Sequence, residues 1–403
     1  MPTSANEYNS RYRADAGGPA PSQVGTDGGW TAVASGHAHT IALRDDGSLW
    51  SWGGGGGIGR TTVGSSITNV QIGTESNWRT VDAGRDFTIA LRDDGTIWGW
   101  GWNEGGVLGL GSPGDRTEPT QIGSDTNWWK LDAGSSTMVA IRTDGTLWAW
   151  GRHKSAGPTQ IGTETNWIAA SAGADSQSVY YDGIHFMALR RDGTLWGWGQ
   201  NQYGQLGIGV TAPTGELLNS PIQVGVDSDW RAVSAGWFHT LAIKGDGSLW
   251  AWGQGGPGAL GLGGGIQATN RPVQVGQDTN WVAVYAGRFE SRALKADGTL
   301  WAWGNIGTPP NANSITTNQP VQVGIETDWR HVTTDDNHFY REGEGPVWPW
   351  KSIASGWRHF VGIRHDGTLW ASGDNFVGQL GQPTFWAPAP IVGRDWGSSL
   401  QRP

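Results

Sequence analysis

The chain repeats one pattern of apolar and polar positions, and the pattern has the period of β-strands. In its fullest copy, apolar and polar side chains alternate over residues 78–83 and 96–100, and an apolar stretch covers 88–92. A period of two residues directs one side of a strand to a core. Asp94-Gly95, between the second and third stretches, is a hairpin dipeptide, because both residues tolerate positive φ. A Pro-x-Gln-Ile/Val-Gly segment then predicts a fourth strand that starts at an edge proline, here over 119–123.

A Trp-x-Trp pair marks the third stretch of each copy. The copies are 48 to 54 residues apart, except that the last step is 69 residues. A four-stranded antiparallel unit of this length, repeated along the chain, is typical of a propeller blade. The first tryptophans of the pairs are Trp50, Trp98, Trp148, Trp196, Trp250, Trp301 and Trp370, and the last pair has Ser372 in place of its second tryptophan.

We therefore predict an all-β fold, a seven-bladed β-propeller of four-stranded antiparallel blades. Residues 344–350 repeat the Trp-x-Trp phrase in damaged form, so a ring of eight blades is the alternative. Either residues 21–25 or residues 388–393 are expected to complete the last blade, and the pattern does not choose between them. The expected organisation is a polar N-terminal arm at 1–20, the propeller at 21–396 with insertions at 174–184 and 329–349, and a C-terminal tail at 397–403.

Composition narrows the classes of function. The 67 glycines require many tight turns, and the 28 tryptophans require many large apolar sites. A formal net charge of −9 disfavours a nucleic-acid partner, which would need a basic face. No apolar run reaches membrane-spanning length and the first residues lack a secretory signal, so we expect neither membrane insertion nor export. The expected location is cytoplasmic, with a virion as the alternative.

Three elements that recur in order resemble the regulator of chromosome condensation repeat. They are Ser35-Gly-His-Ala-His-Thr-Ile-Ala-Leu43, then Asp46-Gly-Ser-Leu-Trp-Ser-Trp-Gly53, and Asn201-Gln-Tyr-Gly-Gln-Leu-Gly207 with its counterpart at 375–381. The resemblance covers roughly residues 21 to 396 and implies a seven-bladed propeller. The terse repeats are similar to those of a bacterial or phage-like member of the family.

No catalytic motif stands out along the chain. The absence of cysteine excludes disulfides, thiol nucleophiles and zinc–thiolate sites. The glycine run at 53–57 lacks the Gly-Lys-Ser/Thr ending of a phosphate loop. A histidine opens the second strand of four copies, and a histidine repeated in this way is a buried hydrogen-bonding residue far more often than a catalyst. We predict no enzyme, no catalytic residues, no cofactor and no metal. These histidines are His39, His185, His239 and His359.

Alternating strands divide the loops between two faces of the ring. One face receives the Asp-Gly turns and the acidic loops between blades. The other receives the irregular connections, on which recognition usually depends. Insertion 329–349 is expected on the acidic face. The candidate binding residues are the loop and insertion aromatics Trp102, Tyr180, Tyr181, Tyr203, Phe339, Trp348 and Trp386.

We expect a non-catalytic protein-binding or assembly propeller, such as a structural or surface-decorating part of a phage virion or another large particle. Protein partners would bind through the irregular loop face and the N-terminal arm. The alternatives implied by the resemblance are a guanine-nucleotide exchange factor and an inhibitor of an enzyme. A light sensor similar to the plant UV-B photoreceptor is a further alternative, suggested by Gly236-Trp-Phe-His-Thr240 and interrupted at Gly287-Arg-Phe-Glu290.

Overall fold

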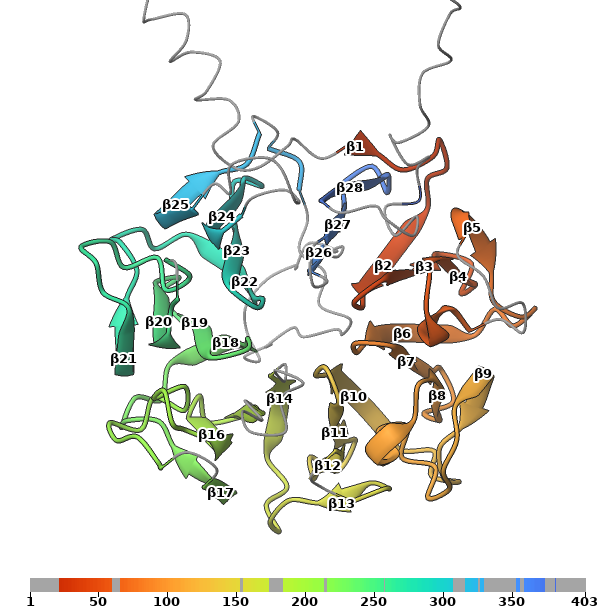
Figure 1. Cartoon of the computed structure of the whole chain (residues 1–403), viewed down its shortest axis with the longest axis horizontal. Coiled ribbons are helices and arrows are strands. Elements are labelled where there is room, and N and C mark those ends of the chain that lie inside the picture. The colour runs from red at the N-terminus through yellow and green to blue at the C-terminus, as the bar shows by residue number, and fades with distance from the viewer. Residues whose placement is uncertain are drawn as a thin grey trace, which may run out of the picture.

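A computed structural model shows four-stranded antiparallel sheets arranged around a common axis (Figure 1). The sheets are built from the repeated unit, with the first strand innermost and the fourth outermost. The residues that the structure describes are 22–59, 66–152, 155–173, 184–213, 216–256, 258–306, 316–324, 327–329, 353–355, 359–373 and 381.

Six blades are each formed by four consecutive strands. Blade 1 contains β2 (Trp30–Ser35), β3 (His39–Arg44), β4 (Leu49–Gly53) and β5 (Ser66–Gln71), and blade 2 contains β6 (Trp78–Ala83), β7 (Phe87–Arg92), β8 (Ile97–Gly101) and β9 (Arg116–Gln121). Blade 3 contains β10 (Trp128–Ala133), β11 (Thr137–Arg142), β12 (Leu147–Gly151) and β13 (Thr159–Gln160), and blade 4 contains β14 (Trp167–Ala172), β15 (His185–Arg190), β16 (Leu195–Gln200) and β17 (Leu217–Gln223). Blade 5 contains β18 (Trp230–Ala235), β19 (His239–Lys244), β20 (Leu249–Gln254) and β21 (Ala268–Gln274), and blade 6 contains β22 (Trp281–Ala286), β23 (Glu290–Lys295), β24 (Leu300–Asn305) and β25 (Thr316–Gln322).

The remaining strands form a closing sheet, and this corrects the predicted number of blades. The closing sheet has the order β1-β28-β27-β26 and joins β26 (Ile353–Ser355), β27 (His359–Ile363) and β28 (Leu369–Gly373) to β1 (Ser22–Gln23) from the other end of the chain. The prediction of a seven-bladed propeller, with eight blades as the alternative, is therefore wrong. Within the described residues the last copy supplies three strands, so six blades are continuous and the ring closes through a composite sheet.

The N-terminal segment pairs in the closing sheet. Ser22 lies opposite Ala371 and Gln23 opposite Trp370, and the Val24 amide donates to the Leu369 carbonyl at 2.7 Å. Figure 1 shows β1 on the outer edge of this sheet, beside β28. Of the two segments left open by the sequence, residues 21–25 contain the pairing strand, whereas 388–393 lie outside the described residues.

The fourth strands differ from the prediction at their prolines. Strand β9 begins at Arg116, three residues before Pro119, and ends at Gln121. The ladder between β8 and β9 shifts register between Gly99 and Gly101, and Pro119 lies in the extra segment opposite that shift. Proline lacks an N–H, so it is tolerated where the ladder is interrupted. Pro221, Pro272 and Pro320 lie at the same kind of shift.

The second tryptophan of each of the six complete Trp-x-Trp pairs packs in the core between neighbouring sheets. Trp100 is fully buried, and its indole N–H donates to the carbonyl of Gly57 in blade 1 at 2.9 Å. The hydroxyl of Thr88 donates to the same carbonyl at 2.8 Å. The carbonyl oxygen of Gly57 thus accepts two hydrogen bonds from blade 2. The arrangement recurs at Gln205, which accepts from Thr240 and Trp252, and at Ala259, which accepts from Ser291 and Trp303.

The repeated histidines are buried hydrogen-bonding residues, as predicted. The Nε2 atom of His39 lies 3.2 Å from the Thr88 hydroxyl of blade 2. Because that hydroxyl gives its hydrogen to Gly57, Nε2 is the donor, and His39 is neutral with its proton on Nε2. Burial lowers the pKa of His39 to about 4, which favours the same state. The other pairs are His185 with Thr240, His239 with Ser291, and His359 with Thr40 across the ring closure.

Side chains of the innermost strands cap backbone amides of the next blade. Asp82 accepts the amide of its neighbour Ala83 and the amide of Ala133 in blade 3, both at 2.8 Å. These amides lie on the inner edge of a sheet, where no further strand can pair with them. Asp132, Ser171 and Ser234 accept amides of blades 4, 5 and 6 in the same way.

The structure also bears on the insertions and on the membrane. Predicted insertions 174–184 and 329–349 lie outside the described residues, apart from Ile184 and Trp329. Trp329 forms an isolated bridge with Arg364 of the closing sheet. Within the ranges given above, no helix has the length and apolar character needed to cross a membrane.

Removing β1 should open the ring. Deletion of residues 1–24 removes the β1 pairing and the buried Val24, which together are expected to lower the free energy of unfolding by about 2 to 4 kcal/mol. Deletion of residues 1–20 is the matched control and should leave the stability unchanged. Urea unfolding followed by tryptophan fluorescence measures both. Equal stability of the two truncated proteins would show that β1 does not hold the closing sheet.

Asp82 should make stability depend on pH. Burial raises its pKa from 3.8 to about 6, outweighing the two amide hydrogen bonds that lower it. Between these values the unfolded chain has lost the proton that the folded chain still holds, so stability falls as the pH rises from about 4 to about 6. It then stays lower by up to about 3 kcal/mol.

The Asp82→Asn variant keeps a carbonyl oxygen for Ala133 and cannot ionise. The free energy of unfolding of the variant minus that of the parent protein should therefore be larger at about pH 8 than at about pH 4. Denaturant unfolding at the two pH values gives this difference. A difference that is constant with pH would contradict the assigned role of Asp82.

Candidate binding surface

The strands end on two faces of the ring, which we name the turn face and the loop face. The turn face carries the Asp-Gly hairpins, which join second to third strands, and the loops that lead from one blade to the next. The Trp78 amide donates to the Gly47 carbonyl at 3.2 Å, so a hairpin of blade 1 contacts the loop before blade 2. The loop face carries the connections from first to second and from third to fourth strands. The predicted sharing of one face by hairpins and inter-blade loops is confirmed.

The glycine of each hairpin is fixed by its backbone and by its neighbour. Gly47 has φ +77°, which glycine adopts without strain. An added Cβ would also overlap the Ser76 carbonyl oxygen in the loop before blade 2. The Asp-Gly turn is therefore both a hairpin and a packing surface for the following blade.

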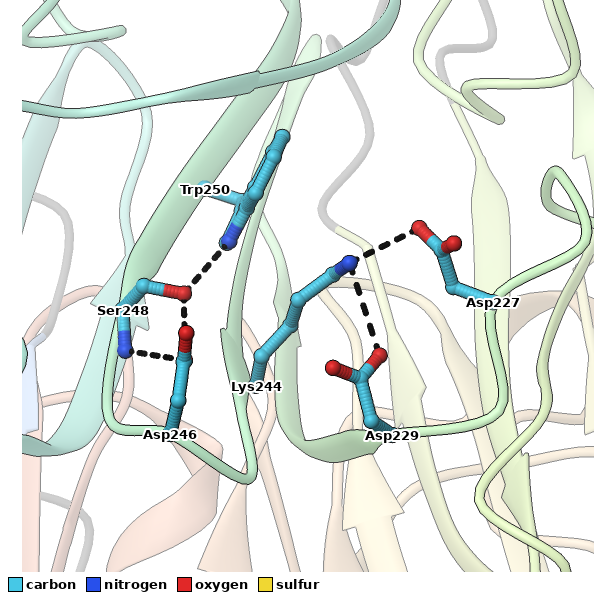
Figure 2. Close-up of polar contacts among 6 residues, drawn as sticks. All are labelled: Asp227, Asp229, Lys244, Asp246, Ser248 and Trp250. Atoms are coloured by element: carbon cyan, nitrogen blue, oxygen red, sulfur yellow. Dashed lines mark hydrogen bonds and ion pairs between the residues drawn. The ribbon is translucent and has the colours of Figure 1, made fainter.

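An Asp–Ser/Thr–Trp relay follows each hairpin. In Figure 2, Asp246 Oδ1 accepts from the Ser248 amide at 2.9 Å and from the Ser248 hydroxyl at 2.6 Å. The Ser248 oxygen accepts the Trp250 indole N–H at 2.8 Å. The Ser248 hydroxyl and then its amide hold the pKa of Asp246 below its ordinary value. The same relay runs through Asp46, Asp94, Asp144, Asp192, Asp297 and Asp366.

A cation at the end of each second strand lies against two tryptophans. The Lys244 ammonium is 5.0 Å from the Trp230 ring and 4.7 Å from the Trp250 ring, and it pairs with Asp227 at 2.8 Å and Asp229 at 3.4 Å (Figure 2). Burial opposes its charge, but the bond to Asp227 and the two carboxylates outweigh burial and raise the pKa of Lys244. The corresponding pairs are Arg44–Asp27, Arg92–Glu75, Arg142–Asp125, Arg190–Glu164, Lys295–Asp278 and Arg364–Asp328.

The loop acids of the turn face are thus engaged within the protein. The sequence analysis predicted where they lie but missed the strand-end cations that pair with them. The signal was present, because a Lys or Arg stands two residues before the hairpin aspartate in each described copy. Predicted acid Glu326 lies outside the described residues.

The loop face holds a row of aromatic rings that the repeat does not explain. The Tyr203 ring meets the Phe238 ring at 4.8 Å, and Phe238 stacks on Trp237 at 4.7 Å. Trp237 lies 5.1 Å from Phe289. The guanidinium of Arg288 covers Trp237 at 3.9 Å and lies 5.1 Å from Phe289. We call these five residues the aromatic row.

The aromatic row crosses three blades. Tyr203 comes from the loop between β16 and β17, Trp237 and Phe238 from the loop between β18 and β19, and Arg288 and Phe289 from the loop between β22 and β23. Trp237 is buried, whereas the other four are half-buried and keep part of their surface in solvent. The corresponding two positions are His37-Ala38 in blade 1, Arg85-Asp86 in blade 2 and Ser135-Ser136 in blade 3.

Of the predicted binding residues, the structure describes two. Tyr203 belongs to the aromatic row. Trp102 is half-buried on the same face in blade 2, where its amide donates to the Asp86 carbonyl at 2.9 Å and its ring packs on the core below. Tyr180, Tyr181, Phe339, Trp348 and Trp386 lie outside the described residues.

The side chains of the aromatic row can contribute non-covalent contacts. Among the residues that the structure places, no group of three or more His, Asp or Glu side chains could hold a metal ion. The half-buried rings and the guanidinium offer apolar contact, π-stacking and planar hydrogen-bond donors.

Removing one hydroxyl should test the relay in Figure 2. The Ser248→Ala variant deprives Trp250 of its acceptor and Asp246 of its strongest donor, so we expect a loss of about 1 to 2 kcal/mol in unfolding free energy. The pKa of Asp246 should rise, as followed by NMR titration. The Ser248→Thr variant is the control, because five other copies use threonine and should tolerate it. A loss as large in the threonine variant would contradict the relay.

Comparisons with known proteins agree with this architecture. The RCC1-like domain matches residues 9–339, and the regulator of chromosome condensation (RCC1) repeat matches residues 350–379. The human probable E3 ubiquitin-protein ligase HERC6 is 30% identical over 195 residues, which are 46% of this chain and 17% of HERC6. The ultraviolet-B receptor UVR8 of Arabidopsis thaliana is 29% identical over 188 residues, which are 45% of this chain and 37% of UVR8. The match therefore spans well under two thirds of either relative.

Solved structures share the fold. The Saccharomyces cerevisiae protein Prp20p, in a study of its binding to Gsp1p and histones, has a TM-score of 0.62 at 21% identity, covering 73% of this chain and 76% of Prp20p. Yeast RCC1 (Prp20) bound to Kap60 has a TM-score of 0.67 at 19% identity, covering 87% and 82%. Human WBSCR16 has a TM-score of 0.67 at 16% identity, covering 89% and 90%. At these identities the likeness concerns the fold alone. The family is shown by the RCC1-like domain, which matches well over half of the residues, and this chain therefore belongs to the RCC1-like domain family.

Proposed function

We propose that this chain is a non-catalytic propeller that binds a protein partner on its loop face. The aromatic row carries the proposal, because three loops from three blades bring aromatic rings together. The loop pairs of blades 1 to 3 that correspond to Trp237-Phe238 contain no Phe, Tyr or Trp. Half-buried aromatic and arginine side chains are enriched where proteins bind one another. The rigid ring below holds the loops in place before binding, which reduces the entropy lost on association.

Relatives with this fold are named for protein contacts. The yeast structures concern Prp20p and its binding to Gsp1p and histones, and RCC1 (Prp20) bound to Kap60. This supports a protein partner here and does not identify it. HERC6 is named as a probable ligase, but the match covers a small part of that protein.

We further propose that the protein is a bacterial or phage-like member of the family and decorates a larger particle such as a virion. Residues 1–20 are polar and contain proline and glycine, a composition suited to docking on an assembly. A virion component is released from the host cytoplasm with the particle. The cytoplasm itself is the location if the partner is a cellular protein.

Two alternatives from the same family have simple tests. A guanine-nucleotide exchange factor would accelerate release of labelled nucleotide from a small GTPase. An enzyme inhibitor would slow its target when added in equimolar amounts. Both alternatives also require a protein partner. They differ from the proposal in what binding does to that partner, and not in the kind of surface that binds it.

Site-specific cross-linking tests the proposed function. A photo-reactive phenylalanine analogue replaces either Tyr203 or Phe289, which lie toward the two ends of the aromatic row, and cells of the native source are irradiated. Both positions should form an adduct with the same protein, identified by mass spectrometry. Val226 is the control position, because it is 90% exposed in a turn-face loop. Adducts at 226 alone, or none at the two row positions, would refute binding on the loop face.

The particle proposal has its own test. Deleting residues 1–20 keeps β1 and should abolish co-sedimentation with the native particle while leaving thermal stability unchanged. Undiminished co-sedimentation of the truncated chain would refute a docking role for the arm.

A further inference from the structure

Asp-Gly pairs are points at which a protein chain can rearrange without help from another molecule. The glycine amide nitrogen attacks the side-chain carbonyl carbon of the aspartate, because glycine has no side chain to obstruct the approach. A C–N bond forms, the carboxyl C–O bond breaks and water leaves, which gives a cyclic succinimide. Water then opens the succinimide at either carbonyl. The products are aspartate and isoaspartate, in which the main chain runs through the former side-chain CH2.

Seven Asp-Gly pairs form the hairpins of the turn face, and each hairpin engages both reacting groups in hydrogen bonds. The Gly47 amide donates to the Arg44 carbonyl at 3.0 Å. Asp46 Oδ1 accepts from the Ser48 amide at 2.9 Å and from the Ser48 hydroxyl at 2.6 Å. The hydroxyl and then the amide keep the pKa of Asp46 below its ordinary value, and an ionised carboxylate is a poor target for a nucleophile. The glycine bond recurs at Gly95, Gly145, Gly193, Gly247, Gly298 and Gly367.

One further pair, Asp27-Gly28, lacks this protection. It lies in the loop between β1 and β2, and both residues are exposed. Within the ranges that the structure describes, no group accepts a hydrogen bond from the Gly28 amide. The Asp27 side chain is 57% exposed, and one of its oxygens pairs with Arg44 at 2.6 Å. An exposed ion pair is weak, so it opens readily and frees the carboxyl group.

The loops before blades 2 to 6 differ from this loop at the residue that follows the loop acid. That residue carries a side chain in each of them, and a side chain obstructs attack by the amide nitrogen beside it. In two of these loops the acid is a glutamate, whose longer side chain closes the corresponding ring less readily. The residues after the acids are Ser76, Thr126, Thr165, Ser228 and Thr279, and the glutamates are Glu75 and Glu164.

We propose that Asp27 is a site of spontaneous covalent modification, at which attack by the Gly28 amide converts aspartate to isoaspartate, while the seven hairpin aspartates react far more slowly. The water released on forming the succinimide is matched by the water that opens it, so the reaction needs no cofactor and no second protein. The inference goes beyond the proposed function and does not depend on it.

The modification acts on the loop that ties the closing sheet to blade 1. Isoaspartate lengthens the main chain between β1 and β2 by one carbon, and it moves the carboxylate that pairs with Arg44. Strand β1 contributes only two residue pairs to the closing sheet, Ser22 with Ala371 and Gln23 with Trp370. We therefore expect protein that carries isoaspartate at position 27 to unfold at a lower urea concentration than fresh protein.

The test follows each Asp-Gly pair of the full chain during incubation in mildly acidic water enriched in the heavy isotope of oxygen. Peptide mapping with fragment mass spectrometry locates isoaspartate and the heavy oxygen that each opening of a succinimide leaves behind. Modification at Asp27 should be faster than at any hairpin by about tenfold or more, the factor expected if a hairpin must first break one hydrogen bond to a charged group. Peptide mapping also separates Asp182-Gly183, which lies outside the described residues.

Two variants and an unfolded sample are the controls. Gly28→Thr reproduces Asp125-Thr126 of the loop before blade 3 and should fold normally, because Gly28 has no positive φ and an added Cβ would lie 3.9 Å from the nearest atom, the Asp366 carbonyl oxygen. Asp27→Glu keeps a carboxylate for Arg44, as Glu75 provides one for Arg92. Both variants should prevent modification at position 27 and keep their urea midpoint during incubation. In urea-unfolded parent protein the hairpin pairs should react as fast as Asp27, because their hydrogen bonds are gone.

Two outcomes would overturn the proposal. One is modification of the folded hairpins at the rate found for Asp27, and the other is equal modification of position 27 in the parent protein and in the folded Gly28→Thr variant. A parent sample that carries isoaspartate at position 27 and unfolds like fresh protein would refute the link to ring closure. None of these results bears on partner binding at the aromatic row, which cross-linking at positions 203 and 289 tests separately.

Discussion

Each sheet of the ring depends on hydrogen-bond acceptors that its neighbour supplies. The carbonyls of Gly57, Gln205 and Ala259 each accept a hydroxyl and an indole N–H from the following blade. These bonds lie in a dry core, where an unpaired donor is costly. They also hold fixed the loop-face connections in which the acceptors lie. The order of these loop-face connections is therefore a consequence of the contacts between neighbouring blades.

The same dependence explains which blades carry a histidine. A histidine opens the second strand where the next sheet offers a hydroxyl, as His39 does toward Thr88. Where the next sheet has an apolar residue at that place, the histidine is absent. At the position of His39, blade 2 has Phe87, and the next sheet has Met138 in place of a hydroxyl residue. Blade 3 has Thr137 at that position, and the next sheet has Phe186. The residue at the histidine position of one blade thus matches the residue it faces in the next blade, and where one of the two departs from the repeat the other does as well.

Most of the fold could be predicted from the sequence because each blade is a local structure. Residues 78–83 form a strand with the predicted bounds. The second strand starts one residue earlier than predicted, and the third starts and ends one residue later. The pairing in the closing sheet could not be predicted from the sequence, because β1 is two residues long and its partner β28 is far away along the chain. The aromatic row was missed except for Tyr203, because its rings come from three loops whose proximity no single repeat reveals. Arg288 and Phe289 had been seen only as an interruption of a motif.

The closing sheet sets an order of events during synthesis. β1 is synthesised before the other strands described here, yet its partner strand β28, Leu369–Gly373, is synthesised after them. Until β28 has been synthesised the blades therefore form an open arc, in which each blade can pack on the one before it but blade 1 lacks the closing sheet as its neighbour. Contacts of such long sequence separation form slowly, and an unpaired sheet face exposed meanwhile promotes association between chains. Ring closure is thus the last step of folding, and a chain cut short before the final hairpin would carry six blades and no means of closing them.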